Sequence, residues 1–334
     1  MVLRAATACL AGALALTTAG LEHIVWARPA ASLEVRLVQP DLPVAAAAMT
    51  AGAQRERTAR VEAMSSRSAL GGRIDLTVWP EGLYAAAMQR LPPELIAPAL
   101  RTAQRTHGAV LVNGFSERAA DSGARTVQNT LWLAEPAAEG GDGARLREVY
   151  QKHHLVPFGE FVPAGFRWFV DALGIPMADQ TPGPAGGAGP VAIAGVESAL
   201  SICYENMFGE ELRLWWRHGN PQVIFNVANL GWFAPHAVGQ FTQMSVMRAL
   251  ETARPFVQAV NNAGSALILP NGLIERSAAP GAQNLDLRVT TYAGEPTWFV
   301  RLGNAPAAAA ALLLLAAGVL AGRLGRARRA GTKV

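Results

Sequence analysis

Chemistry could centre on the stretch from Ala199 to Glu205, an apolar run that stops at a cysteine and carries a carboxylate two residues later. Such a run predicts a buried strand with Cys203 at its carboxyl end. Cys203 is a candidate nucleophile, but a free thiol is mostly protonated at neutral pH and needs a base and oxyanion donors beside it. The alternative is that Cys203 is only a small buried hydrophobe.

Two charged residues are candidate partners for this thiol. Glu81 follows a strand predicted over 74–79, and ligands of open α/β sheets bind beyond the carboxyl ends of strands. It is therefore a candidate general base, with a solvated turn glutamate as the alternative. Lys152 stands among apolar and aromatic neighbours and is a candidate buried cation that stabilises an oxyanion. The alternative is a lysine that protects a strand edge from pairing.

We predict neither a metal site nor a cofactor. His153 and His154 are adjacent, and adjacent residues on an extended segment point to opposite faces. No nearby spacing of Cys, His or Asp completes a ligand set. The chain contains only two cysteines, Cys9 and Cys203, so we expect no disulfide framework and a free thiol at Cys203.

Helices and strands alternate from residue 34 to residue 301, which predicts one α/β domain that positions these groups. Strands are predicted over 34–39, 74–79, 109–113, 129–134, 191–194, 199–203, 222–227, 256–261, 265–269 and 285–291. Helices are predicted over 53–70, 93–107, 208–218 and 239–253. The helix over 208–218 would place Cys203 near a helix N-terminus, whose dipole lowers the pKa of a thiol.

Apolar segments occupy both ends of the chain. Residues 5–21 are uncharged, which predicts a membrane anchor or signal over 1–27; without a clear Ala-x-Ala cleavage site we favour an anchor. Residues 302–322 are uncharged and precede a basic tail over 323–334, the pattern of a transmembrane helix with a cytoplasmic tail. A buried Ala/Leu core helix is the alternative. The domain between these segments would then lie on the periplasmic side of a bacterial inner membrane.

The positive charge of the chain points to lipid rather than to nucleic acid. The formal net charge is +4, and the tail over 323–334 alone holds five cations. A basic segment next to an apolar span suits anionic lipid headgroups. We therefore expect a membrane partner and no nucleic acid.

Three segments resemble the nitrilase (carbon–nitrogen hydrolase) superfamily, and within it the apolipoprotein N-acyltransferase branch. They are Trp-Pro-Glu at 79–81, the stretch 152–160 that runs from the lysine through His-Leu-Val-Pro-Phe-Gly-Glu, and Ile-Cys-Tyr-Glu at 202–205. Residues 247–255 and 261–264 continue the resemblance, which covers roughly residues 34–300.

The resemblance implies a four-layer α-β-β-α sandwich over 34–301. It implies that Glu81 is the general base, Lys152 the oxyanion stabiliser and Cys203 the nucleophile. Glu160 would support the base and the lysine, and Tyr204 and Glu205 would shape the site. The implied activity is that of a membrane-anchored acyltransferase or amidase working through a cysteine thioester. Its acyl donor would be a membrane phospholipid, and its acceptor an amine such as that of a lipoprotein.

Several positions depart from the pattern of that branch. Its members carry a multi-helix membrane bundle before the domain, where this sequence has room for one span. The usual aspartate, histidine and arginine near the site are Leu230, Phe241 and Gln258. A second interpretation is therefore a shortened TraB-type conjugal transfer protein, acting as a small-amide hydrolase or as a non-catalytic scaffold. A third, a secreted soluble amidase, is disfavoured by residues 302–322.

Overall fold

Two six-stranded sheets form the core of the computed structural model, which describes residues 24–44, 50–67, 72–119, 125–137, 143–173, 179–187 and 189–330. The first sheet has the order β12-β1-β2-β3-β4-β5, with bounds Gln283–Gly294, Ala27–Gln39, Leu76–Val78, Ala109–Ala119, Arg125–Pro136 and Ala144–Gln151. The second has the order β11-β10-β9-β8-β7-β6, with bounds Ile274–Ser277, Ala266–Ile268, Phe256–Val260, Val223–Ala228, Val196–Ile202 and Val191–Ile193. The central strands of each sheet are parallel, so their carboxyl ends lie at one edge.

The strands of the first sheet bury both of their faces. Along β1, Val35 and Leu37 belong to the core between the two sheets, whereas Val38 belongs to a second core beneath the helices. In β3, Leu111 belongs to the core between the sheets and Val110 to the core beneath the helices. Successive side chains of a strand point to opposite faces, so an unbroken apolar run predicts a strand covered on both sides.

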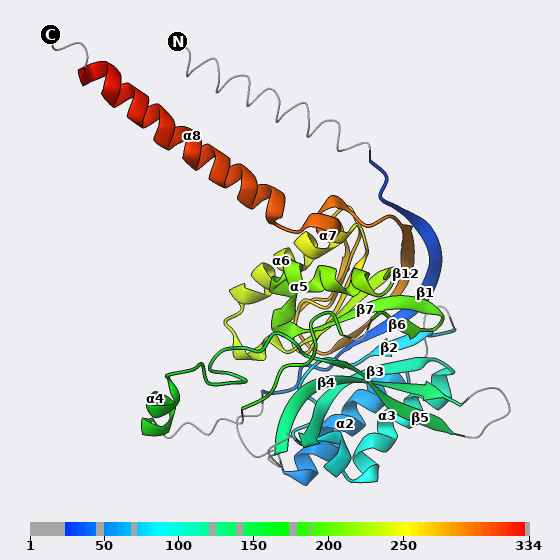
Figure 1. The fold of residues 1–334 in the computed structure, drawn as a ribbon. Helices are drawn as coiled ribbons and strands as arrows, with labels where there is room; N and C mark the ends of the chain where they lie inside the picture. Colours follow the sequence, from blue (N-terminus) through cyan, green and yellow to red (C-terminus); the bar gives the residue numbers. More distant parts are fainter. Residues whose placement is uncertain are drawn as a thin grey trace.

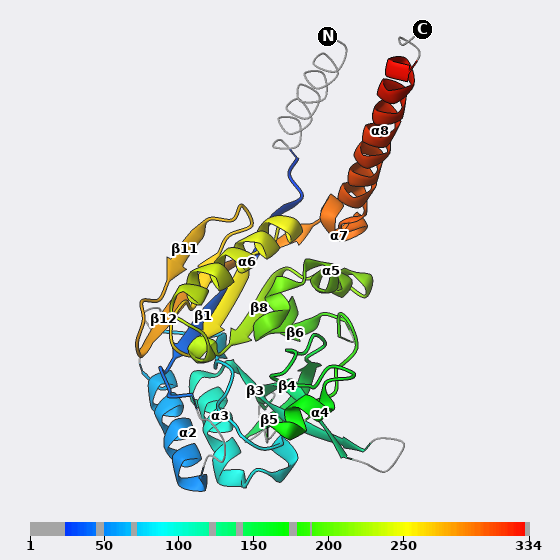
Figure 2. The same cartoon turned by 90° about the vertical axis from the view of Figure 1, so that its left-hand side faces the viewer.

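Helices cover the outer faces of the two sheets (Figures 1 and 2). Helices α2 (Ala51–Ser65) and α3 (Pro93–Thr106) lie over the first sheet, and α6 (His236–Thr252) lies over the second. The short helix α4 (Arg167–Ala172) stands away from both sheets. The expected α/β architecture with two sheets and covering helices is confirmed.

The helix expected over 208–218 is wrong. The chain instead forms the 3₁₀ helix η2 (Cys203–Met207), the one-turn α5 (Gly209–Leu212) and the 3₁₀ helix η3 (Arg213–Arg217). Tertiary packing sets this path: a Cβ at Gly209 would lie only 2.5 Å from a carboxylate oxygen of Glu251, and Trp215 is buried. Close contact with α6 therefore outweighs helix propensity here.

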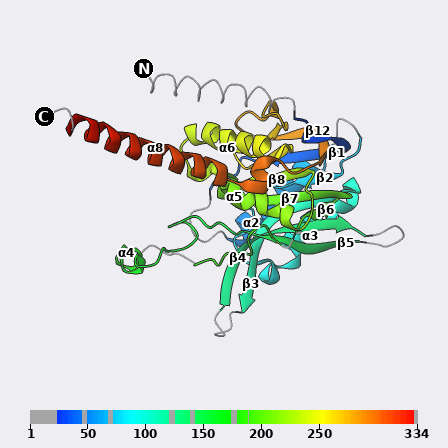
Figure 3. The same ribbon diagram turned by 45° about the horizontal axis from the view of Figure 1, so that its top comes forward.

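The last helix leaves the domain. Helix α7 (Trp298–Leu302) is followed by α8 (Ala305–Ala330), which projects away from the sheets (Figures 1 and 3). Residues Ala305–Arg323 are long and apolar enough to cross a membrane, with a mean hydropathy of 2.1, and the protein buries none of that window. The alternative of a buried core helix is therefore wrong. The anchor predicted over 1–27 lies almost wholly outside the described residues.

Candidate active site

Glu81, Lys152 and Cys203 each follow a strand, and the structure brings them together. Glu81 comes after β2, Lys152 directly follows β5 and Cys203 directly follows β7. The Glu81 carboxylate is within hydrogen-bonding reach of the Cys203 thiol, and Lys152 is close enough to shift the pKa of both. Lys152 is 1% exposed, so the predicted buried cation is confirmed and the strand-edge alternative is wrong.

The thiol is held at a sharp turn of the backbone. Cys203 has φ of +49° and is the first residue of η2, so the chain turns abruptly where β7 ends. A positive φ is uncommon for a residue with a side chain, and such residues concentrate at functional sites. The Asn226 side chain on β8 supports the turn by donating to the Cys203 carbonyl oxygen at 3.4 Å.

One amide bridges the two carboxylates beside the lysine. Asn129 Nδ2 donates to Glu81 Oε1 at 3.1 Å and to Glu160 Oε1 at 3.2 Å. The same oxygen of Glu160 pairs with Lys152 Nζ at 2.8 Å. The other oxygen of Glu160 accepts from the backbone N–H of Val156 at 2.8 Å. Glu160 thus holds the lysine and, through Asn129, orients the candidate base.

Burial and mutual charge decide the protonation of this cluster. Burial raises the pKa of the Glu81 carboxyl, and Lys152 only partly offsets that rise. Burial alone would lower the pKa of Lys152, but Glu81, Glu160 and Cys203 more than compensate, so its pKa is raised and it stays charged. Burial raises the pKa of the Cys203 thiol, and Glu81 raises it further. The net shift of the thiol pKa is thus upward, and the helix over 208–218 that was expected to lower it does not form.

A raised thiol pKa fits a nucleophile that is deprotonated only as it attacks. The resting thiol is neutral, and the adjacent Glu81 carboxylate is placed to take its proton when the bond to carbon forms. The same carboxylate accepts the backbone N–H of Asn229 at 3.2 Å, which fixes its direction.

Glu205 links the turn that begins at Cys203 to the segment that carries Lys152. Its Oε1 accepts from the Tyr150 hydroxyl at 2.8 Å and from the backbone N–H groups of His153 and His154 at 2.7 and 3.1 Å. Its Oε2 accepts from the backbone N–H of Ile202 at 2.7 Å. A buried carboxylate with four donors is a strong cross-link between two loops. Its contacts place Glu205 in a supporting position.

Tyr204 takes part in an aromatic cluster next to the thiol. Its ring is 5.6 Å from the His154 ring and 5.1 Å from the Phe208 ring, and it is half-buried. The His154 ring also stacks on Phe208 at 3.5 Å and pairs with Glu211 at 2.8 Å. The cluster packs Tyr204, the residue after Cys203, against the segment that follows Lys152.

Gly82 is needed where it stands. Its φ is +93°, and a Cβ there would lie 2.6 Å from the side-chain nitrogen of Asn229. Its backbone N–H donates to Asn113 Oδ1 at 3.3 Å. A side chain at this position would push the segment that carries Glu81 away from Cys203.

Sequence reasoning missed the asparagines of this site. Asn113 Nδ2 donates to Asn129 Oδ1 at 2.6 Å, which leaves the Nδ2 of Asn129 facing the two carboxylates. Both side chains are buried and lie on neighbouring strands of the first sheet. Asparagine is depleted in strands and costly to bury unpaired. Asparagines inside otherwise apolar strands were therefore the available signal.

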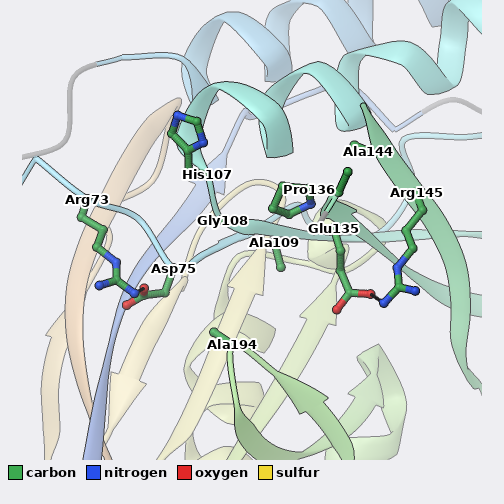
Figure 4. Close-up of a pocket in the computed structure, with 11 residues that line it drawn as sticks. Arg73, Asp75, His107, Gly108, Ala109, Glu135, Pro136, Ala144, Arg145 and Ala194 are labelled. Atoms are coloured by element: carbon green, nitrogen blue, oxygen red, sulfur yellow. Dashed lines mark hydrogen bonds and ion pairs between the residues drawn. The ribbon is translucent and has the colours of Figure 1, made fainter. Parts of the chain in front are cut away.

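A pocket between the strands of the first sheet lies away from this site. It has a volume of about 720 Å³ and sits at the amino ends of β2 and β3, opposite the ends that lead to Glu81 and its partners. Figure 4 shows its Arg73–Asp75 and Arg145–Glu135 ion pairs, with N–O distances of 2.5 and 3.3 Å. Its arginines are paired with its carboxylates and it holds no nucleophile, so Cys203 remains the candidate nucleophile.

The chain belongs to the carbon–nitrogen hydrolase family, whose sequence profile matches residues 35–291. It is 35% identical to an apolipoprotein N-acyltransferase from Ralstonia nicotianae, covering 96% of this chain and 58% of the relative. A second apolipoprotein N-acyltransferase, from Bordetella bronchiseptica, is 33% identical, covering 94% of this chain and 60% of the relative. The chain thus spans about three-fifths of the length of these curated relatives.

Solved structures share the fold. A CN-hydrolase superfamily protein from Xanthomonas campestris matches with a TM-score of 0.55 and 18% identity, covering 78% of this chain and 91% of that protein. Nit3 from Saccharomyces cerevisiae, a member of the nitrilase superfamily, matches with a TM-score of 0.53 and 15% identity, covering 78% of this chain and 91% of that protein. The two-sheet arrangement is therefore the nitrilase fold.

Proposed function

We propose that this protein is a membrane-anchored N-acyltransferase that moves an acyl group from a phospholipid to an amine through a thioester on Cys203. The observation that carries the proposal is the buried cluster of Glu81, Lys152 and Cys203, in which a base, a cation and a thiol meet. The domain over 34–301 would be a four-layer α-β-β-α sandwich with a membrane segment at each end, on the periplasmic side of the inner membrane.

The first half-reaction forms the thioester. The sulfur of Cys203 attacks the ester carbonyl carbon of the phospholipid while Glu81 takes the thiol proton. The carbonyl oxygen becomes an oxyanion, which the charged Lys152 stabilises. The carbon–oxygen bond to the glycerol then breaks, Glu81 returns its proton to that oxygen, and a lysophospholipid leaves.

The second half-reaction transfers the acyl group. A neutral amine attacks the thioester carbonyl carbon and passes one proton to Glu81. The new oxyanion again faces Lys152. The carbon–sulfur bond then breaks, the sulfur recovers its proton from Glu81, and an amide is released. If water takes the place of the amine, the same steps give hydrolysis.

Two features of the surface support a lipid donor. Helix α8 carries the apolar window Ala305–Arg323, none of which packs against the domain. The segment that follows Glu160, which pairs with Lys152, exposes several large apolar side chains. They are Phe166, Trp168, Phe169 and Leu173, which are 43–69% exposed. Exposed apolar groups of this size indicate a surface for an apolar ligand.

The names of the curated relatives also support an amine acceptor. The two relatives described above are apolipoprotein N-acyltransferases. We therefore develop this function in preference to conjugal transfer. The acceptor that we propose is the amino terminus of a lipoprotein.

The test is acyl transfer by the purified full chain in detergent. The protein would be mixed with phosphatidylethanolamine carrying a labelled acyl chain and with a synthetic lipopeptide that has a free amino terminus. The expected result is a labelled amide on the lipopeptide and no product with Cys203→Ala. Fatty acid release without amide would overturn transfer in favour of hydrolysis, and product from Cys203→Ala would overturn the thioester.

A further inference from the structure

Exposed apolar side chains form a band along the edge of the domain from which α8 rises. The band, called the collar below, consists of Met247 and Leu250 on α6, Leu273 in the β10–β11 turn, and Trp298 and Leu302 on α7. Each of these side chains is between 46% and 59% exposed. Figure 2 shows β11, α6 and α7 along the edge of the domain from which α8 rises.

The three elements of the collar touch one another. A Cβ on Gly272 would lie 3.0 Å from Leu250 Cγ, so the β10–β11 turn rests against α6. The Thr297 hydroxyl, at the start of α7, donates to the carbonyl oxygen of Glu251 on α6. The collar is therefore one contiguous surface. A contiguous exposed apolar patch marks an interaction site, whereas single exposed apolar residues do not.

The junction between the domain and α8 is short and held in place. Only Gly303 and Asn304 separate α7 from α8. The backbone N–H of Asn304 donates to Glu210, which also pairs with Arg213 at 2.6 Å. Consecutive Cα atoms are about 3.8 Å apart, so Leu302 at the end of α7 lies within about 11 Å of Ala305, the first residue of the apolar window. Once α8 enters a bilayer, the collar lies at its boundary.

The chemistry of the collar suits that boundary. The Trp298 ring meets the Trp26 ring edge to face at 5.8 Å, so two tryptophans stand beside the start of α8. The Arg301 guanidinium lies over the Trp298 ring at 5.5 Å. Tryptophan is enriched at the membrane–water interface, and arginine can keep its charge among the headgroups while its stem covers apolar surface.

We propose that the collar is a docking surface for the lipid bilayer and that it holds the domain against the membrane in one orientation. This inference rests on the membrane attachment of α8 in the proposed function. The occupant is lipid because the collar continues directly into an apolar helix that no other part of the domain covers.

The experiment places a fluorophore on the collar. Leu273→Cys and, as a matched control, Ala192→Cys would each be made in the full chain in a Cys9→Ser, Cys203→Ala background. Ala192 is exposed on β6, at the opposite edge of the second sheet from β11. Each cysteine would be labelled with bimane in nanodiscs that contain brominated phosphatidylcholine, and aqueous iodide would serve as the second quencher.

Docking predicts that brominated lipid lowers the fluorescence at position 273 by about twofold or more, as expected for a group at the acyl boundary. Iodide should quench it weakly, and position 192 should show the reverse. Equal iodide quenching at both positions would overturn the proposal, because the domain would then swing freely. Protection of position 273 from both quenchers would also overturn it, because protein and not lipid would cover the collar.

A second measurement separates this inference from the proposed function. The double variant Leu250→Glu, Leu273→Glu should accept an acyl group on Cys203 from a soluble activated ester at the wild-type rate. From phospholipid vesicles its acylation should fall about tenfold or more, since two charges oppose docking. If the double variant is acylated from vesicles at the wild-type rate, the proposed docking surface is refuted. Failure of the wild type to react with the soluble ester would instead refute the thioester mechanism, while the quenching result would still stand on its own.

Discussion

Replacing Lys152 by methionine tests how the buried cluster controls the base. Asn129 Nδ2 is 3.1 Å from an oxygen of Glu81 and 3.2 Å from an oxygen of Glu160, so these oxygens are at most about 6 Å apart. Two charges at about 6 Å repel by about 3 kcal/mol at an effective dielectric constant of about 20, which corresponds to about two pKa units. Lys152 offsets this repulsion in the wild type, and methionine fills similar space without charge.

The direction of the effect follows from the raised pKa of Glu81. A carboxyl with a raised pKa is an available base only above that pKa, so thiol reactivity is lost as pH falls through it. In Lys152→Met this loss should begin about two pH units higher. The thiol also loses a neighbouring cation that lowers its own pKa, which acts in the same direction.

The assay is the rate of Cys203 alkylation by iodoacetamide from pH 5 to pH 10, followed by intact-mass spectrometry. Alkylation forms no oxyanion, so it reports the protonation of the cluster without the second role of Lys152. Arg147→Met is the matched control, since Arg147 lies on β5 as well and pairs with Glu135 at 2.8 Å. A midpoint in Lys152→Met that stays within about half a pH unit of the wild type would refute the reasoning.

Three further predictions concern the neighbours of the thiol. Asn129→Asp replaces the bridging donor with a third carboxylate, so acylation of Cys203 by a soluble ester should fall about 100-fold or more; a change below about fivefold would contradict the bridge. Glu205→Ala leaves four donors without an acceptor and should lower the free energy of unfolding by about 3 kcal/mol, and Glu205→Gln should lower it by less. Thermal unfolding in detergent measures both variants, and melting temperatures equal to that of the wild type would argue against the cross-link. In the wild type the acylation rate should rise with pH through a midpoint above 4.5, the ordinary pKa of Glu81, and a rate independent of pH from 4 to 8 would remove Glu81 as the base.

Much of the fold could be predicted from local patterns. Apolar runs such as those containing Val35 and Leu111 predict strands buried on both faces, and both residues lie in the core between the sheets. Polar residues placed directly after such runs predict a site, because parallel strands end at one edge. Glu81 follows a strand of the first sheet and Cys203 a strand of the second, so their meeting also requires the two sheets to stack.

Other features depend on contacts between distant segments. The bridge from Asn129 to both carboxylates requires the pairing of β4 with β3 and β5, and a sequence does not give that register. The chain after Cys203 bends because Gly209 packs closely against α6, a contact that helix propensity does not reflect. The pKa of the thiol is raised because burial and Glu81 act together, and both depend on tertiary structure.

The central claim is that Cys203 carries the acyl group, and intact-mass spectrometry tests it most directly. The detergent-solubilised full chain would be incubated with phosphatidylethanolamine. Its mass would be measured, and peptide mapping would then locate any adduct. We expect one acyl adduct on the peptide that contains Cys203, which hydroxylamine removes and which is absent from Glu81→Gln. An adduct on another residue, or no adduct with either phospholipid or a soluble ester, would contradict it.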